Sequence, residues 1–105
     1  SQDVFLNIAG GLKVEEPAAD LGIIAAVASS IRNKPGPTDA VFCGEVGLGG
    51  EVRSVSQIAG RVKEAQRLGF RRAIVPKRNA AERVKGIEII GVDAIRAALE
   101  TAEIL

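Results

Sequence analysis

The serines and lysines are the residues with which covalent chemistry could begin in this chain of 105 residues, because it contains no histidine. Without histidine the usual general base near neutral pH is missing, and so are the Ser–His and Cys–His nucleophile pairs. A Ser–Lys dyad survives this restriction. The candidate nucleophiles are Ser29, Ser30, Ser54 and Ser56. None of them lies in a strained turn flanked by glycines, so these residues alone do not predict a hydrolase.

The other reactive groups favour structural roles. Cys43 lies in an apolar run that predicts a strand, so we expect an inert core thiol. A single cysteine forms no intrachain disulfide and no CxxC metal site, which is consistent with a reducing, intracellular compartment. Glu15, Glu16 and Asp20 bring three carboxylates together, but acid–base catalysis needs pKa values that burial has separated. We expect a solvated helix start there, and no metal site.

A glycine-rich run at residues 44–50 (GEVGLGG) invites a phosphate-loop interpretation. No Gly-Lys-Ser/Thr follows, and the next residues read as a strand rather than as a helix. The third glycine of a dinucleotide fingerprint is also missing. The run therefore predicts a tight turn, with a β-hairpin between residues 40–46 and 51–55.

The net charge of +1 hides a strong separation of charge along the chain. Residues 53–85 hold ten basic and two acidic residues, a formal charge of +8, whereas the remainder holds four basic and eleven acidic residues, a formal charge of −7. This basic block predicts a polyanion-binding face or a self-complementary contact between subunits, and a solvated surface of uneven charge is the alternative. Three Phe and no Trp or Tyr favour contacts to phosphates over base stacking.

The hydrophobic pattern and the turn residues predict strands and helices that alternate around this block. The expected strands are residues 4–8, 12–14, 40–46, 51–55, 72–75 and 87–92. The expected helices are residues 18–33, with Pro17 in the first turn, residues 56–68, capped by Ser56, and a last helix capped by Asp93. Residues 34–39 are expected to form a loop, and residues 77–85 a basic loop or short helix. The mixture predicts a single α/β domain of two or three layers over residues 1–105.

Two of these helices carry apolar patterns that specify their surroundings. Ile58, Val62, Ala65 and Leu68 recur at helical spacing and should form a buried stripe. The helix at residues 18–33 is apolar nearly all round, so both of its faces need cover. Either it is a buried central helix, or the sheet and a neighbouring subunit share it.

The apolar runs and the composition also bear on location. The longest apolar run, residues 21–28, has eight residues, far short of the roughly 20 that a membrane helix needs. We therefore expect a cytoplasmic protein without membrane contact. The chain contains no Met, which predicts a fragment or a processed product.

Four motifs together carry a resemblance to a known family. They lie at residues 3–14 (DVFLNIAGGLKV), 16–21 (EPAADL), 44–53 (GEVGLGGEVR) and 69–76 (GFRRAIVP). In this order they resemble the C-terminal domain of the bacterial RadA (Sms) family of DNA repair proteins, a domain that is similar to the proteolytic domain of Lon protease. The resemblance spans essentially all 105 residues. It implies a Lon-like layered α/β (α+β) fold with a mixed sheet packed against helices.

The resemblance also implies a longer parent chain. Members of the family carry an N-terminal zinc finger and a RecA-like ATPase core, neither of which is present in these residues. We therefore expect ATP, Mg and Zn in the missing parts of the parent, and no cofactor in this domain. The parent is expected to be a DNA-dependent ATPase, or helicase, that drives branch migration in recombinational repair of DNA damage.

The Lon-type catalytic dyad is degenerate when it is carried over. The serine of that family stands at the start of the central helix, where residues 18–22 (AADLG) match and Asp20 takes its place. The lysine near the start of the next helix corresponds to Ala59. Aspartate without an activating base does not replace a Ser–Lys pair, and the nearby Arg61 cannot act as a base at accessible pH. The resemblance implies a domain without peptidase activity; a residual peptidase that uses Ser56 in a shifted register is the remaining alternative.

Assembly and DNA contact are the roles that the resemblance leaves for this domain. Lon-type domains form hexameric rings, so we expect a homo-oligomer, a hexameric ring, that contacts single-stranded or branched DNA, with a recombinase as a further partner. The expected DNA-facing residues are Arg61, Lys63, Arg67, Arg71, Arg72, Lys77 and Arg78. The alternative is a purely structural ring-forming module whose charges pair subunits without DNA contact.

Overall fold

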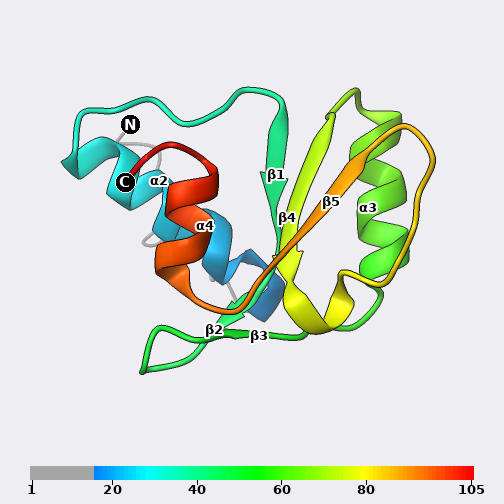
Figure 1. Ribbon diagram of the computed structural model, residues 1–105, viewed down its shortest axis with the longest axis horizontal. Coiled ribbons are helices and arrows are strands. Elements are labelled where there is room, and N and C mark those ends of the chain that lie inside the picture. Colours follow the sequence, from blue (N-terminus) through cyan, green and yellow to red (C-terminus); the bar gives the residue numbers. More distant parts are fainter. Residues whose placement is uncertain (1–15) are drawn as a thin grey trace.

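The computed structural model describes residues 16–105, and a three-stranded parallel sheet forms its centre (Figure 1). The strands lie in the order β1 (Ala40–Phe42), β4 (Arg72–Pro76) and β5 (Glu88–Val92). On one face of the sheet lie α2 (Asp20–Ile31) and α4 (Ile95–Thr101), and on the other lies α3 (Ile58–Arg67). The expected layered α/β class is confirmed. The strands expected at 4–8 and 12–14 lie outside the described residues.

The central strand β4 separates two hydrophobic clusters. Its side chains alternate, so that Ala73 and Val75 pack with the buried residues of α3. Ile74 packs on the opposite face, with buried residues of α2 and α4. All three side chains are fully buried. A strand that is covered on both faces must be apolar throughout, which explains the continuous run Ala73-Ile74-Val75.

The strand predicted at residues 40–46 is divided at Gly44, which corrects its length. The Gly44 N–H donates to the Ala18 carbonyl (2.9 Å), and the Gly44 carbonyl accepts from the Leu21 N–H (3.0 Å). These two bonds pull the chain out of the sheet and toward the start of α2. A Cβ at Gly44 would lie 2.9 Å from Val52 Cγ1, so only glycine permits this close approach.

The predicted hairpin is confirmed in a shorter form. β2 (Glu45–Val46) pairs antiparallel with β3 (Val52–Arg53). The turn between them is held by a bond from the Gly50 N–H to the Gly47 carbonyl (3.0 Å). An isolated bridge between Glu51 and Ala94 attaches the hairpin to the start of α4.

The expectation that Ser56 and Asp93 cap helices is wrong. The N-cap of α3 is Gln57 in the left-handed region (φ 60°), the N-cap of α4 is Ala94, and neither makes a capping bond with its side chain. The left-handed residue turns the chain away before a serine at position 56 can reach the first helical N–H groups. The Asp93 carbonyl accepts from the Val52 N–H (2.9 Å), so the backbone at position 93, just after β5, is still bound to the hairpin and the helix begins later.

Burial of the predicted stripe on α3 is confirmed for three of its four residues. Ile58, Val62 and Ala65 are buried, whereas Leu68 is 62% exposed. The difference arises because α3 ends at Arg67, so that Leu68 no longer follows the helical stripe.

The helix expected at residues 18–33 is a short 3₁₀ turn, η2 (Pro17–Ala19), followed by α2. Leu21 and Ala25 are the buried residues of α2, and Ile31 is 72% exposed. A fully buried central helix is therefore not what the chain forms. Cover of the outer face by a neighbouring subunit stays a prediction. None of the helices in residues 16–105 has the length and the apolar character needed to traverse a bilayer.

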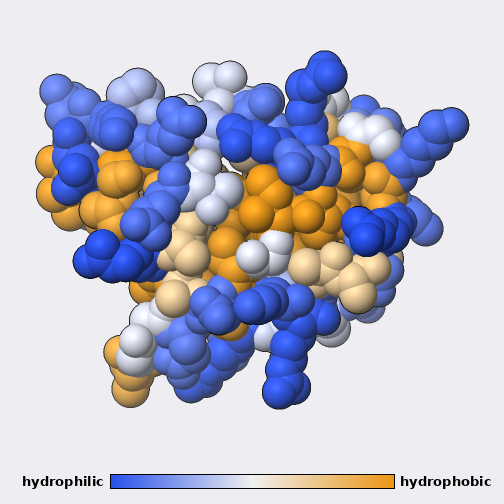
Figure 2. Space-filling view, in the orientation of Figure 1, coloured by the Kyte–Doolittle hydropathy of each residue, from blue (hydrophilic) through white to orange (hydrophobic). Residues whose placement is uncertain are grey.

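The parallel strands give the sheet two distinct ends. The carboxyl ends of the strands meet at the lower edge in Figure 1, beside the β2–β3 hairpin, the starts of α2 and α3, and η3 (Lys77–Asn79). We call this end the carboxyl edge and the opposite end the amino edge. Figure 2 shows hydrophobic residues in the middle of this view, over β4 and β5, and again at its left edge, whereas hydrophilic residues cover most of the rest of its rim. Ligands of α/β domains usually bind at the carboxyl ends of strands, so we expect a site at the carboxyl edge.

Candidate anion-binding groove

An open groove of about 720 Å³ lies at the carboxyl edge, between the β2–β3 hairpin and η3. A hydrogen bond joins its two walls, because Asn79 Oδ1 of η3 accepts from the Val55 N–H that follows β3 (3.1 Å). Pro76 ends β4 and sets the backbone from which η3 begins (φ −60°). The groove is lined by Glu45, Val52, Arg53, Ser54, Lys77, Arg78 and Asp93.

Three cations and two carboxylates set the electrostatics of this lining. Lys77 and Arg78 are exposed, and within residues 16–105 neither of them takes part in an ion pair. Arg53, in contrast, lies 2.7 Å from Glu51 and 3.9 Å from Glu45. The groove therefore presents two cations that have no acidic partner in the described part of the chain, and a third that is already paired.

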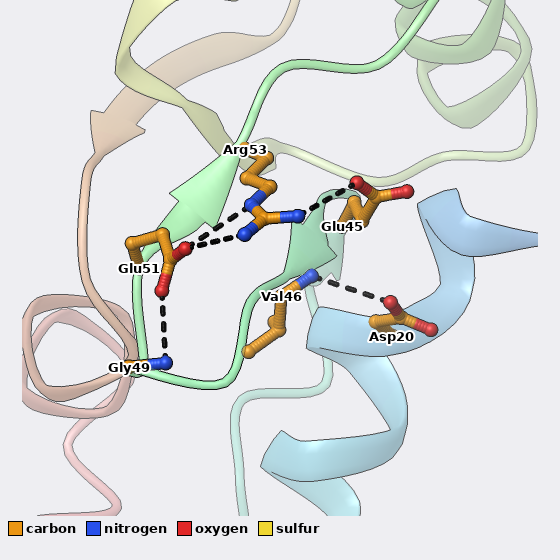
Figure 3. A network of polar contacts seen from close by, with 6 residues as sticks. All are labelled: Asp20, Glu45, Val46, Gly49, Glu51 and Arg53. Carbon is orange, nitrogen blue, oxygen red and sulfur yellow. Dashed lines mark hydrogen bonds and ion pairs between the residues drawn. The ribbon is translucent and has the colours of Figure 1, made fainter.

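A polar network closes the hairpin beside the groove (Figure 3). Arg53 donates from Nε and Nη2 to Glu51 Oε2 (3.1 and 2.7 Å), and the Gly49 N–H donates to Glu51 Oε1 (3.0 Å). The pKa of Glu51 is lowered, first by a hydrogen bond from its own backbone N–H and then by Arg53. A Cβ at Gly47 would lie 2.1 Å from Glu51 Oε2, so glycine leaves the space that this carboxylate fills.

The two positions that the resemblance matches to a Ser–Lys dyad, Asp20 and Ala59, lie in the first turns of α2 and α3. Asp20 lies in the first turn of α2, and its Oδ2 accepts from the Val46 N–H of β2 (3.2 Å; Figure 3). The carboxylate thus links the hairpin to the helix, and it also suits the positive end of the helix dipole. Ala59 is half-buried in the first turn of α3. The absence of peptidase activity stays a prediction.

Of the remaining reactive groups, Ser54 lines the groove together with Lys77, and Cys43 and Ser29 contact structural neighbours. Cys43 is half-buried against the cluster beneath α3 rather than fully in the core, and burial raises the pKa of its thiol. The Ser29 hydroxyl donates to the Lys34 carbonyl. Across residues 16–105 no three side chains of His, Cys, Asp or Glu gather as they would around a metal ion.

The seven DNA-facing candidates do not form one surface. Lys77 and Arg78 lie in η3 at the carboxyl edge, whereas Arg71 and Arg72 flank the start of β4 at the amino edge. Arg67, in the last turn of α3, also lies at the amino edge. A basic block that is continuous in sequence is therefore divided between opposite ends of the sheet.

Several of these candidates already have acidic partners. Arg72 pairs with Asp39 (3.0 Å), and Arg67 pairs with Glu64 one turn earlier. Arg61 is bound to Glu16 (2.9 Å) and to the Ser56 carbonyl (3.1 Å). Lys63 and Arg71 are exposed and take part in no ion pair found in residues 16–105.

Arg53 and Glu51 are groove or network residues that sequence reasoning missed as a site, and Ser54 was considered only as a nucleophile. Arg53 stands within the basic block, and the glycine turn beside it was recognisable as a hairpin. The hairpin lies beside η3 because β4 pairs with β1 and β5, which brings distant parts of the sequence together. A local sequence pattern does not predict such long-range pairing.

The chain is similar to one family model and to several curated proteins. Residues 1–79 match the family model described as subunit ChlI of Mg-chelatase. The DNA repair protein RadA of Bacillus subtilis (strain 168) is 51% identical over 104 residues, 97% of this chain and 23% of that protein. RadA of Pseudomonas aeruginosa is 53% identical over 100 residues (94% and 22%), and RadA of Escherichia coli (strain K12) is 48% identical over 99 residues (93% and 22%). The chain thus spans less than a quarter of the length of these curated relatives.

Proposed function

The chain belongs to the family described as subunit ChlI of Mg-chelatase and is a segment of a RadA-type DNA repair protein, and from this premise we propose that it is a DNA-contacting and scaffolding domain in DNA repair. The rest of the parent chain would supply the ATPase and couple ATP hydrolysis to branch migration during recombination. This domain would add a surface that holds the DNA backbone, and it would carry no catalytic activity of its own.

The observation that carries this proposal is the pair Lys77 and Arg78 in the groove. The two cations are neighbours on a 3₁₀ turn, both are exposed, and both lie free of ion pairs within the described range 16–105. Lysine and arginine in such positions bind phosphate oxygens without reading the bases. Within residues 16–105 no aromatic residue lines the groove, which favours backbone contacts over base stacking.

The test is a double substitution, Lys77→Ala/Arg78→Ala, in the full-length parent. DNA affinity should fall at every sequence tested, and the slope of log affinity against log salt should become shallower by about 2, since each lost phosphate contact removes about 1. Binding to a single-stranded and a branched oligonucleotide is measured over a salt series.

The matched control is Arg83→Ala/Lys85→Ala, which removes two cations of the same basic block that line no part of this groove. The control should leave the salt slope unchanged. If the groove variant behaves like the control, the groove is not a DNA contact and the proposal is overturned.

A second candidate function, assembly into a homo-oligomeric ring, is favoured by an apolar groove of about 450 Å³ on the outer side of α2. Its lining includes Ile23 and Ile24 of α2, Ile95 of α4, and Leu48 at the hairpin turn. Leu48 is fully exposed, and an exposed apolar residue beside an apolar groove is typical of subunit contacts.

Leu48→Asp in the parent separates the two functions. If the apolar groove holds subunits together, this variant shifts the measured mass toward smaller species, whereas Leu68→Asp, at an exposed leucine on the α3 side, does not. Equal masses for both variants and the unchanged parent would contradict the ring contact at this groove.

A further inference from the structure

Arg53 differs from the other cations of the groove because it is already bound to a carboxylate. Its Nε and Nη2 both donate to Glu51 Oε2 (3.1 and 2.7 Å). Its Nη1 lies 3.9 Å from Glu45 Oε1, which is an ion-pair contact and too long for a hydrogen bond. The side chain is 55% exposed. Arg53 therefore faces the solvent of the groove while Glu51 accepts from its Nε and Nη2, two of the three nitrogens of the guanidinium.

Glu51 is held in this position by the turn and not by Arg53 alone. Its Oε1 accepts from the Gly49 N–H (3.0 Å), so a backbone donor and a guanidinium converge on one carboxylate. The carboxylate fills the space that a side chain at Gly47 would need, since a Cβ there would come within 2.1–2.6 Å of the Glu51 carboxyl atoms. The hairpin thus forms a cradle for an anion, and the anion is supplied by the chain itself.

A phosphate can replace this carboxylate. Arginine binds carboxylate and phosphate through the same pairs of N–H donors, and a phosphate offers more oxygens. The pair Arg53–Glu51 is exposed on both sides, 55% and 45%, and exposed ion pairs contribute little net free energy. A polyanion held by Lys77 and Arg78 on the same groove would therefore compete with Glu51 at close range.

We propose that Glu51 regulates the groove from within: its carboxylate occupies Arg53 when no nucleic acid is bound, and a backbone phosphate takes its place when DNA enters. The proposal rests on the proposed function, because it assumes that the groove holds phosphates. It assigns Arg53 as a third phosphate contact, and it assigns Glu51 as a competitor that lowers affinity.

The test compares Glu51→Gln with Glu64→Gln in the full-length parent. Both substitutions remove one negative charge from an exposed Glu–Arg pair, but Glu64 pairs with Arg67 at the amino edge. DNA affinity of the Glu51 variant should rise by up to about fivefold, the size of one exposed ion pair. The Glu64 variant reports the effect of charge alone, and it should fall well short of this gain.

Two further variants make the outcome independent of the charge change. Gly47→Ala keeps every charge, but its Cβ would displace the Glu51 carboxylate from Arg53. This variant should therefore also raise the affinity for DNA. Adding Arg53→Gln to Glu51→Gln should remove the gain, because the freed guanidinium is then missing; such non-additivity is the signature of a direct coupling.

The possible results distinguish the role of Glu51 from the proposed function, in which the groove binds DNA. Equal affinities for Glu51→Gln and Glu64→Gln, or a gain that persists without Arg53, would overturn the role of Glu51 even where Lys77→Ala/Arg78→Ala weakens binding. If the Lys77/Arg78 variant binds DNA as the unchanged parent does, the groove itself fails as a DNA contact.

Discussion

At the scale of single residues, Asp20, which the resemblance matches to a catalytic serine, stabilises the contact between two elements of the fold. Asp20 accepts a hydrogen bond from the Val46 N–H, and this bond fastens the hairpin to α2. Short polar side chains at a helix start often satisfy backbone groups in this way. The polar residue at position 20 therefore has a role in stability that is independent of any catalytic ancestry.

Asp20→Ala should lower the free energy of unfolding of the 105-residue chain by about 1–2 kcal/mol, because it leaves the half-buried Val46 N–H without its acceptor. Asp20→Asn keeps an acceptor oxygen and should lose less than half as much. Urea unfolding followed by circular dichroism measures both. A loss in the Asn variant as large as in the Ala variant would point to charge rather than to the hydrogen bond.

The acidity of Glu51 gives a second test at this scale. Its folded-state pKa lies below the ordinary value, so its contribution to stability is present at neutral pH and is lost as the pH falls through that folded-state pKa. In Arg53→Gln the pKa of Glu51 should rise, yet stay below the ordinary value, because the bond from its own backbone N–H remains.

Carboxyl resonances followed by NMR over acid pH measure this change. Arg67→Gln is the control: it should raise the pKa of Glu64, whose pKa Arg67 lowers, and leave that of Glu51 unchanged. A Glu51 titration that does not respond to the loss of Arg53 would mean that the pair does not persist in solution.

At the scale of elements, the type of most helices and strands in residues 16–105 followed from hydrophobic spacing, whereas their exact limits, and the division of the strand expected at 40–46 into β1 and β2, did not. The buried stripe Ile58, Val62 and Ala65 and the hairpin around the glycine run were readable because both patterns are local. The caps at Ser56 and Asp93 were not, because backbone contacts from distant residues, such as the Val52 N–H on the Asp93 carbonyl, decide where each helix begins.

The position of η3 depends on a glycine in the neighbouring strand. A Cβ at Gly91 of β5 would lie 2.6 Å from Ala80 Cβ and 3.1 Å from Lys77 Cα. Gly91→Ala should therefore displace η3 and destabilise the chain by about 1–3 kcal/mol, as overpacking does. Urea unfolding measures the loss, and weaker DNA binding by the parent would report the displaced Lys77.

Gly60→Ala provides the matched control, since outside the helix's own backbone no atom of the described residues lies within 4 Å of the Cβ that it would add to α3. This variant should be stabilised by about 0.5–1 kcal/mol, because alanine replaces glycine within a helix. If Gly91→Ala were as stable as Gly60→Ala, η3 would be loosely packed and the groove wall would not be rigid.

At the scale of the whole molecule, charge that is gathered in sequence is divided in space. The basic block runs from β3 through α3 and β4 to the loop before β5, so it visits both the carboxyl and the amino edge. The sequence therefore indicated which residues could contact a polyanion, but not which of them share a surface. That second question depends on the direction of α3 and β4, which the strand pairing alone decides.

Arg71→Ala/Arg72→Ala in the parent tests this division. Because these residues lie at the amino edge, away from Lys77 and Arg78, the salt slope of DNA binding should stay unchanged while Lys77→Ala/Arg78→Ala makes it shallower. Loss of the contact between Arg72 and Asp39 should cost less than about 1 kcal/mol of stability. Equal changes in slope for both pairs would mean that DNA contacts both edges.

The central place of β4 has a consequence for how the domain is made. In the described sheet β4 is the strand that pairs on both sides, and it contributes fully buried residues to both clusters. Its first residue is Arg72, so 71 of the 105 residues leave the ribosome before it does. Until then neither α2 nor α3 has the complete surface on which its apolar side packs, and the cluster of α2 further needs Val92, Ala98 and Leu99, which emerge later. Nascent chains of this protein should therefore depend on chaperones until β5 and α4 have followed β4, and then fold in one cooperative step.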